Sequence, residues 1–245
     1  MGALVTAIMA AGKGTRMKSD LPKVLHKINN RPMVHYVIDL AHEVQSQRIV
    51  LIIGHKKELV EKACAGMPVE FVYQLEQLGT GHAVQMTEPI LKDFTGDILV
   101  LSGDVPLLTK KTIEDLIHVH EESAAVATML TSDLSDPTGY GRVLRDEEGY
   151  VQKIVEHKDA SDEELAIKEI NVGIYIFRSA DLFRALKKVD NNNVQGEYYL
   201  PDVIPMFISD GKKVMAVKTP HFDETRGINT IAQLKEAETI LSGRS

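Results

Sequence analysis

Glycine and basic side chains follow the first apolar run of the sequence. The run Leu4–Ala10 breaks into the segment GKGTR at residues 12–16, and Lys23 lies a few residues further on. Because glycine has no Cβ, the backbone N–H groups at Gly12 and Gly14 can approach a ligand closely, and the basic side chains surround it with positive charge. This combination predicts a site for a phosphorylated ligand.

The common phosphate-binding motifs do not fit this segment. A P-loop requires four residues between its first glycine and a Gly-Lys-Ser/Thr ending, and that spacing does not occur. A dinucleotide-binding loop requires Gly-x-Gly-x-x-Gly, but Met17 stands in place of the third glycine. Hydride transfer with NAD is therefore disfavoured. On this segment alone, a plain turn with solvated lysines stays open.

A second candidate segment places a carboxylate after another apolar run. The run Asp97–Leu101 ends in Ser102, Gly103 and Asp104. Beside a phosphate site Asp104 would suit Mg²⁺, because this ion takes few protein oxygens and completes its shell with phosphate oxygens and water. Without the basic segment, the favoured interpretation of Asp104 is a cap of a turn or a helix.

The surrounding elements determine whether these two segments can meet. Short β-branched runs alternate with helical stretches, which predicts an α/β fold: a Rossmann-like, mostly parallel sheet with helices on both faces. Loops that follow parallel strands lie at the carboxyl edge of such a sheet, where ligands bind. The expected strands are Leu4–Ala10, Ile49–Ile53, Val69–Tyr73, Asp97–Leu101 and Ala125–Thr131, and the expected helices are Pro32–Val44, Glu58–Ala65, His82–Leu91 and Thr112–Glu122.

The alternation changes after Thr131. Two short runs flank an acidic turn, which is typical of a β-hairpin, and a further strand follows. We therefore expect one domain over residues 1–228 with a β-rich insertion over about residues 132–178, and then a C-terminal helix within residues 229–245. The expected later elements are strands Gly141–Arg145, Tyr150–Glu156, Asn171–Phe177 and Val214–Lys218, and helices Asp181–Val189, Asp202–Ile208 and Thr230–Leu241.

Composition excludes several classes of partner. The net charge of −7 over 245 residues argues against binding to nucleic acid. The run Leu4–Ala10 is too short for a membrane span and has no preceding basic residue, as a signal peptide would. A single cysteine, Cys64, can form neither an intrachain disulfide nor a multi-thiolate zinc site. We expect a cytoplasmic protein that binds neither nucleic acid nor membranes, and the oligomeric state is not indicated.

The histidines do not form a catalytic motif. The pair His118 and His120 lacks the His-Glu-x-x-His spacing of zinc proteases, and both are expected on a helix surface.

Eight blocks of residues, in the same order, resemble the sugar-1-phosphate nucleotidylyltransferases. They are most similar to the N-acetylglucosamine-1-phosphate uridylyltransferases, which form the pyrophosphorylase half of bifunctional bacterial enzymes. No single block is specific, but their common order is. The blocks are AAGKGTRM with LPKVLH (10–17, 21–26), QLEQLGTGHA (74–83), GDVPL (103–107), GYGR (139–142), EHKDA (156–160), EIN (169–171), NNNVQGEYY (191–199) and GIN (227–229).

The resemblance implies roles on the nucleotide side. The cations Arg16 and Lys23 would neutralise a triphosphate and stabilise charge as pyrophosphate leaves, and with Asp104 they would form the catalytic group. For each cation alone, a solvated loop position is an equal alternative. The nucleotide-binding residues implied are Met9, Ala10, Ala11, Gly12, Lys23 and Gly103, with Gln74, Gly79 and Thr80 at the uracil, whose edge suits a side-chain amide.

The resemblance also implies a metal site and a sugar pocket. Asp104 and Asn229 would hold Mg²⁺, although Asn229 could instead be the N-cap of the last helix. Gly141, Glu156, Asn171 and Tyr199 would bind the sugar. Glu156 would accept from hydroxyl groups and Asn171 would bond the acetamido group. As alternatives, Glu156 could be a solvated strand-end carboxylate and Asn171 a turn residue.

The sequence departs from the family pattern on the sugar side. Val172 stands where the family often has threonine, and Leu200-Pro201 replaces a common Ile-Thr, so two hydroxyl groups are missing. Ser102 replaces a frequent tyrosine. The chain also ends without the hexapeptide repeats of an acetyltransferase half, and acetyl transfer is not expected of it.

The implied reaction is a uridylyl transfer from UTP to N-acetylglucosamine-1-phosphate, giving UDP-N-acetylglucosamine, a cell-wall precursor, and pyrophosphate. A sugar-phosphate oxygen would attack the α-phosphorus in line with the help of Mg²⁺, and no general base is required. Three alternatives stay open: another sugar-1-phosphate, another nucleotide such as CTP or GTP, and a nucleotide-binding regulatory module without turnover.

Overall fold

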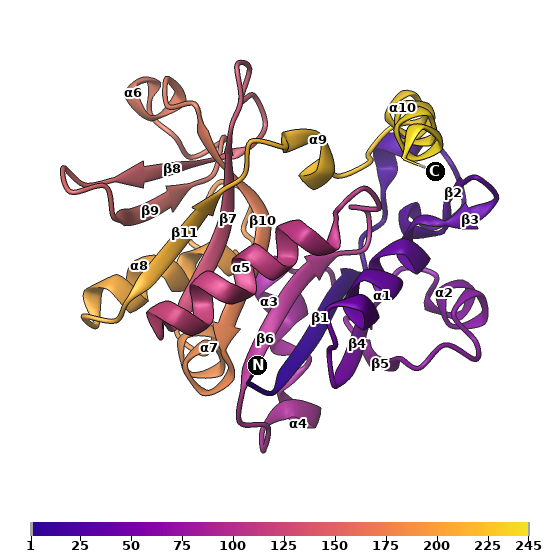
Figure 1. Ribbon diagram of the computed structural model, residues 1–245, viewed down its shortest axis with the longest axis horizontal. Helices are drawn as coiled ribbons and strands as arrows, with labels where there is room; N and C mark the ends of the chain where they lie inside the picture. The colour runs from indigo at the N-terminus through magenta and orange to yellow at the C-terminus, as the bar shows by residue number, and fades with distance from the viewer. Residues whose placement is uncertain (1, 245) are drawn as a thin grey trace.

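A computed structural model describes residues 2–244 of the chain, which fold around one large sheet (Figure 1). The strands are β1 (Leu4–Ala10), β2 (Lys27–Ile28), β3 (Arg31–Pro32), β4 (Arg48–Ile53), β5 (Glu70–Tyr73), β6 (Asp97–Ser102), β7 (Ala127–Asp133), β8 (Gly141–Arg145), β9 (Val151–Val155), β10 (Glu169–Arg178) and β11 (Val214–Lys218). The helices are α1 (Met33–Glu43), α2 (Lys57–Ala63), α3 (Thr80–Gln85), α4 (Glu88–Leu91), α5 (Lys110–Ser123), α6 (Asp162–Leu165), α7 (Ser179–Leu186), α8 (Val203–Ser209), α9 (Phe222–Thr225) and α10 (Ile231–Gly243). Short 3-10 helices cover Thr15–Met17, Lys23–Leu25 and Leu200–Asp202.

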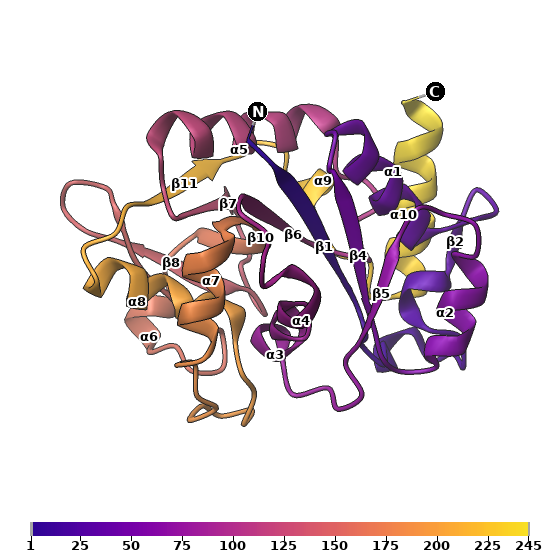
Figure 2. The ribbon, with the colours of Figure 1, turned by 90° about the horizontal axis from the view of Figure 1, so that it is seen from below.

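The main sheet confirms the expected α/β fold. Its strand order is β11-β7-β10-β6-β1-β4-β5, and every neighbouring pair is parallel except those that involve β10. Helices α1 and α5 cover one face, and α3, α4, α7 and α8 cover the other (Figure 2). The Rossmann-like arrangement therefore has a carboxyl edge at which loops from β1 and β6 can meet.

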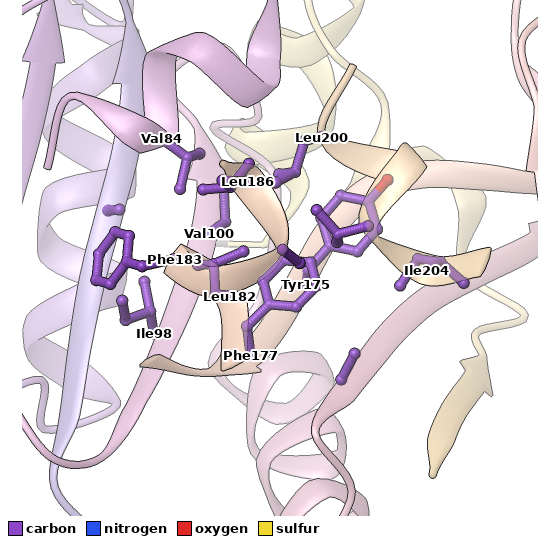
Figure 3. Packing of buried hydrophobic residues seen from close by; sticks show 14 of the residues in the cluster. Val84, Ile98, Val100, Tyr175, Phe177, Leu182, Phe183, Leu186, Leu200 and Ile204 are labelled. Atoms are coloured by element: carbon purple, nitrogen blue, oxygen red, sulfur yellow. The ribbon is translucent and has the colours of Figure 1, made fainter. Parts of the chain in front are cut away.

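The side chains of β1 point alternately to the two faces of the sheet, and they are apolar on both, which explains why helices cover both faces. Val5 and Ala7 join the core beneath α3, α4, α7 and α8, whereas Leu4, Ile8 and Ala10 join the core beneath α1, α2 and α5. Successive side chains of a strand point to opposite faces, so a strand that is apolar at nearly every position must be buried on both. Figure 3 shows the first of these cores, in which α7 packs on β6 and β10.

The expected helix His82–Leu91 is wrong in one respect, because two helices occupy these residues. Helix α3 ends at Gln85 and α4 begins at Glu88, with Pro89 in its first turn. Proline has no N–H to donate and its ring crowds the preceding turn, so it is tolerated at the start of a helix and not in its middle.

Strand β10 differs from its expected place in the β-rich insertion. Both halves of β10 pair with β7; on its other side Tyr175 to Arg178 pair with β6, while Ile170 and Asn171 pair with β8. The hairpin β8–β9 is thus attached to the sheet through the first half of a long strand whose second half is central. The register shifts between Asn171 and Tyr175, and this irregularity lets one strand serve both parts.

Helix α5 corrects the expectation for the histidine pair. His118 is exposed, but His120 is buried, and its ring bonds Thr128 Oγ1 (2.8 Å) and lies 3.3 Å from Asp97. His120 continues the apolar stripe of Ile113, Leu116 and Ile117 at helical spacing. That spacing would have placed it in the interior had it been applied to histidine as well as to apolar residues.

Candidate active site

The loops after β1 and β6 leave the sheet side by side. Strands β1 and β6 are adjacent and parallel, with Met9 opposite Ser102, and Gly103 N donates to Met9 O at 2.9 Å. A side chain at Gly103 would crowd this contact, since a Cβ there would lie 3.3 Å from Met9 O. The expected meeting of the glycine segment with Asp104 therefore rests on direct strand pairing.

A cavity of roughly 240 Å³ opens at this edge. Most of the predicted nucleotide-side residues line it, namely Met9, Ala10, Ala11, Gly12, Lys23, Gln74, Gly79, Thr80 and Asp104. Gly103 and Arg16 do not line it, but Gly103 donates to Met9, which does, and Arg16 shares the acceptor Asn229 with the lining residue Lys23. This space is called the nucleotide-side cavity below.

Charged and amide groups from three distant parts of the chain converge at one end of this cavity. Lys23 Nζ donates to the Asp104 carboxylate and to Asn229 Oδ1 (2.9 Å), and Arg16 Nη2 donates to the same Asn229 oxygen (2.7 Å). Asp104 is 6% exposed. Two cations face one carboxylate, which leaves a positive surplus suited to phosphate groups.

The donor set is compatible with one divalent cation. A carboxylate oxygen and an amide oxygen are hard ligands of the kind that Mg²⁺ accepts, and the Lys23 ammonium touches both, so one positive group can bridge them. Within residues 2–244, His, Cys, Asp and Glu nowhere gather in threes as a protein-only metal site would require. With Asp104 and Asn229 as two protein ligands, an ion held here would take its remaining ligands from phosphate and water.

Asn229 is not the N-cap of the last helix. Thr230 fills that position: its hydroxyl accepts from Gln233 N, and the Gln233 side chain in turn accepts from the backbone of Thr230. The side chain of Asn229 is thereby left for Lys23 and Arg16. Ile228 N donates to Asp104 O at 2.9 Å and so ties the segment before α10 to the loop after β6.

The far wall of the nucleotide-side cavity is a loop closed by hydrogen bonds. Gln74 Nε2 bonds both Gly79 O (2.9 Å) and His82 Nδ1 (3.2 Å), so Gln74 presents its amide oxygen, and not both amide groups, to a ligand. The loop is joined to a segment before α8, since Tyr198 N donates to Leu78 O and Gly81 N donates to Tyr198 O, each at 2.8 Å. Any ligand held by Gly79 is thus coupled to the chain around Tyr198.

A second cavity of roughly 200 Å³ adjoins the first, and Met9 and Thr80 line both. Of the predicted sugar residues, Gly141, Glu156 and Asn171 line it. Tyr199 does not line it, because its hydroxyl accepts from Gln195 Nε2 (2.6 Å) in a buried position to one side. This second space is called the sugar-side cavity below.

Asn171 and Glu156 provide different hydrogen-bonding groups to the sugar-side cavity. Asn171 Oδ1 accepts from Gly173 N at 3.1 Å, which leaves its NH₂ group as a donor. Burial raises the pKa of Glu156, and the carboxylates of Asp202, Asp159 and Glu197 raise it further. An acid in such a setting gains from hydroxyl donors, which would favour its charged form.

Asp202 is one of the carboxylates near Glu156, and its charge should lower the free energy of unfolding at high pH. Burial, with Asp190 and Asp159 nearby, raises the pKa of Asp202 from 3.8 to about 6. The folded state then holds the proton more tightly than the unfolded state does. The stability that this proton adds is complete at low pH and is lost as pH rises through about 6.

Asp202→Asn should therefore stabilise the protein at pH 8 by about 1 kcal/mol, a figure already discounted for partial exposure. The gain should vanish toward pH 4 in thermal or urea unfolding. Asp93→Asn, at an exposed position, is the control and should leave the pH profile unchanged. A gain that grows as pH falls would contradict the sign of this prediction.

Sequence reasoning missed several cavity residues. Gln77 and Glu197 line the nucleotide-side cavity, and Tyr140 and Tyr175 line the sugar-side cavity. Tyr140 stands inside the block GYGR, from which only Gly141 was assigned. Tyr175 alternates with Ile174 and Ile176 along a buried strand, so its sequence context indicates only the core.

The sequence matches one protein family, and the structure is similar to a solved structure. The sequence profile of the Nucleotidyl transferase family matches residues 5–223. The chain is 50% identical over 237 residues to the "Bifunctional protein GlmU" of Bacillus cereus (strain AH187), and equally to that of Bacillus thuringiensis (strain Al Hakam). These alignments cover 97% of this chain and 51% of each relative, so the chain spans about half the length of the curated relatives it matches.

A solved structure, "UDP-glucose pyrophosphorylase complexed with UDP-glucose", aligns with 99% of this chain and all of its own, with a TM-score of 0.75 at 16% identity. At that identity the likeness concerns the fold alone. Within the described residues, no helix has the length and hydrophobicity that crossing a membrane requires.

Proposed function

The chain belongs to the nucleotidyl transferase family, and we propose that it transfers a uridylyl group from UTP to N-acetylglucosamine-1-phosphate, giving UDP-N-acetylglucosamine and pyrophosphate. Identity of 50% to relatives over nearly the whole chain supports an activity of this class. The observation that carries the proposal is the convergence of Lys23, Asp104 and Asn229 at the end of one of two adjoining cavities.

Two adjoining cavities suit a reaction between two substrates. The nucleotide-side cavity ends in cations and would take the triphosphate. The sugar-side cavity has a carboxylate and an amide but, among the residues that the structure describes, no lysine or arginine in its lining, and it would take the neutral sugar ring. Met9 and Thr80 lie at the boundary, where the sugar phosphate would meet the α-phosphate of UTP.

The chemistry needs positioning and charge stabilisation more than proton transfer. The second pKa of a phosphate monoester is about 6, so the attacking oxygen is already anionic near neutral pH. Its attack forms the new P–O bond as the bond to pyrophosphate breaks. Lys23 and Arg16 would neutralise the leaving pyrophosphate, and alignment of the two substrates would supply much of the remaining rate gain.

Asp104 and Asn229 would hold the Mg²⁺ ion. When bound, the ion would neutralise phosphate charge and fix the triphosphate in one orientation. We further propose a cytoplasmic location. Burial raises the pKa of the Cys64 thiol to about 11, so this cysteine is an inert core group that requires no oxidising compartment.

A matrix of nucleoside triphosphates against sugar-1-phosphates, with pyrophosphate detection, tests the proposal. UTP with N-acetylglucosamine-1-phosphate should give the highest kcat/KM and should require a divalent ion. A strong preference for CTP or GTP would remove the uridylyl assignment. Tight UTP binding in calorimetry with no product under any combination would indicate a regulatory module instead.

Glu156→Ala should raise the KM for the sugar phosphate by about tenfold or more while leaving the KM for UTP nearly unchanged, because Glu156 lines only the sugar-side cavity. Burial and the neighbouring carboxylates raise the pKa of Glu156, so its charged form adds no stability to the folded protein, and the conservative change Glu156→Gln should not lower the melting temperature.

Glu148→Ala in the exposed hairpin turn provides the control and should alter neither constant. If Glu156→Ala raises the KM for UTP alone, Glu156 belongs to the nucleotide and the assignment of the two cavities is reversed.

A further inference from the structure

Tyr175 carries a buried hydroxyl group that has no partner in the protein. The residue is 2% exposed in β10, and within the described residues nothing forms a hydrogen bond of normal geometry with its Oη. The amide of Asn171 is close enough to affect the pKa of the phenol, yet it does not complete such a bond. A buried polar group without a partner costs free energy, so its retention calls for an explanation.

The ring of Tyr175 is held firmly. It stacks on Phe177 with centroids 5.3 Å apart and an interplanar angle of 24°, and it belongs to the cluster that contains Leu200 and Ile204. Figure 3 shows the hydroxyl oxygen at the end of the ring that points away from Phe177. The hydroxyl cannot turn to another partner without disturbing this packing.

Tyr175 also lines the sugar-side cavity. Burial raises the pKa of the phenol, so the group stays neutral and keeps its proton as a donor. Of the described residues that line the cavity, Thr80, Tyr140 and Tyr175 carry hydroxyl groups and Val172 and Pro201 carry none; Tyr140 is only half-buried, and Thr80 Oγ1 accepts from Leu200 N (3.0 Å). Tyr175 and the NH₂ group of Asn171 are thus two neutral donors in one part of the lining.

We infer that Tyr175 is a specificity-determining residue, whose hydroxyl donates a hydrogen bond to the carbonyl oxygen of the acetamido group on the bound sugar phosphate. Two neutral donors match a carbonyl oxygen, which has two lone pairs and no charge. A phosphate or carboxylate would be expected to face lysine or arginine, and within residues 2–244 neither residue type lines this cavity. The inference rests on the proposed function, since it names the group by which that function's sugar is recognised.

Tyr175→Phe tests the inference because it removes only the hydroxyl and keeps the stacked ring. The KM for N-acetylglucosamine-1-phosphate and the calorimetric Kd for UDP-N-acetylglucosamine should each rise about fivefold to tenfold, as expected for one lost hydrogen bond. The preference for this substrate over glucose-1-phosphate should fall by a similar factor. The KM for UTP should not change, and the melting temperature should stay constant or rise, because an unpaired buried group is removed.

Tyr36→Phe is the matched control. The Tyr36 hydroxyl donates to Ile28 O at 2.8 Å, and both residues lie outside the described lining of the two cavities, so its removal should lower the melting temperature and leave both substrates unaffected. A fall in melting temperature for Tyr175→Phe like that of Tyr36→Phe would mean that the hydroxyl is satisfied within the protein, and would overturn the inference.

Assays of the wild-type protein distinguish a failure of the inference on Tyr175 from a failure of the proposed function. If the wild-type protein turns over N-acetylglucosamine-1-phosphate, and Tyr175→Phe keeps the same KM, Kd and preference, the inference on Tyr175 fails and the proposed function stands. If the wild-type protein uses UTP with glucose-1-phosphate only, the proposed sugar is wrong and the inference falls with it.

Discussion

Asp104→Asn is expected to lower kcat by about 10²-fold to 10³-fold, which is typical for the loss of one charged group that stabilises a transition state. Asp104 provides the carboxylate that Lys23 contacts beside Asn229, and an amide in its place would hold a divalent cation less tightly. Steady-state kinetics across a range of Mg²⁺ concentrations measures the effect. Raising Mg²⁺ should restore part of the lost turnover.

The fold should survive this change. Asparagine has nearly the same shape, and the backbone carbonyl at position 104 would still accept from Ile228 N. The control is Asp115→Asn, which also breaks a lysine–aspartate pair, with Lys111, but on the exposed face of α5. Such surface pairs contribute about 0–1 kcal/mol, so the control should retain full activity. Unchanged turnover in Asp104→Asn at every Mg²⁺ concentration would mean that the metal site lies elsewhere.

The nucleotide side of the site was more predictable than the sugar side, for a physical reason. The residues Met9 to Gly12 and Asp104 follow two apolar runs, and neighbouring parallel strands bring the ends of such runs together whatever the rest of the chain does. By contrast, the contact of Asn229 with Lys23 joins residues more than two hundred positions apart. Only the family resemblance pointed to Asn229, because local patterns carry no information about so distant a partner.

The sugar side depends on β10, whose role no local pattern indicates. The strand was expected from its β-branched and aromatic residues, but its antiparallel place between β6 and β7 follows from long-range pairing. This position takes Tyr175 into the sugar-side cavity, where sequence reasoning had assigned no role. It had assigned one to Tyr199, which lies to the side of that cavity. A buried tyrosine is an ordinary core residue until its hydroxyl is found without a partner.

Gly79→Ala is expected to lower kcat/KM by about 10²-fold, since displacements of the order of 1 Å in a positioning loop can cost that much. Gly79 has φ of +111° and ψ of 175°, a conformation that is essentially restricted to glycine. A Cβ there would lie 2.5 Å from Tyr198 O and 2.8 Å from Tyr198 N, both backbone atoms that cannot rotate away. The substitution would therefore separate the loop that ends at Gly79 from the segment around Tyr198.

Both substrates should be affected, which distinguishes this change from Glu156→Ala. The Gly79 carbonyl anchors Gln74 on the nucleotide side, while Leu200, next to the displaced segment, lines the sugar-side cavity. The KM for UTP and the KM for the sugar phosphate should rise together, and the free energy of unfolding should fall by about 2–4 kcal/mol.

Gly149→Ala separates backbone strain from steric displacement. Gly149 also has a positive φ, +87°, but no atom lies within 4 Å of its added Cβ in the exposed hairpin turn. It should lose about 1 kcal/mol of stability and no activity. If Gly79→Ala behaves like Gly149→Ala, with lower stability but both KM values intact, the contact between Gly79 and Tyr198 does not position the substrates, and the two cavities bind their ligands independently.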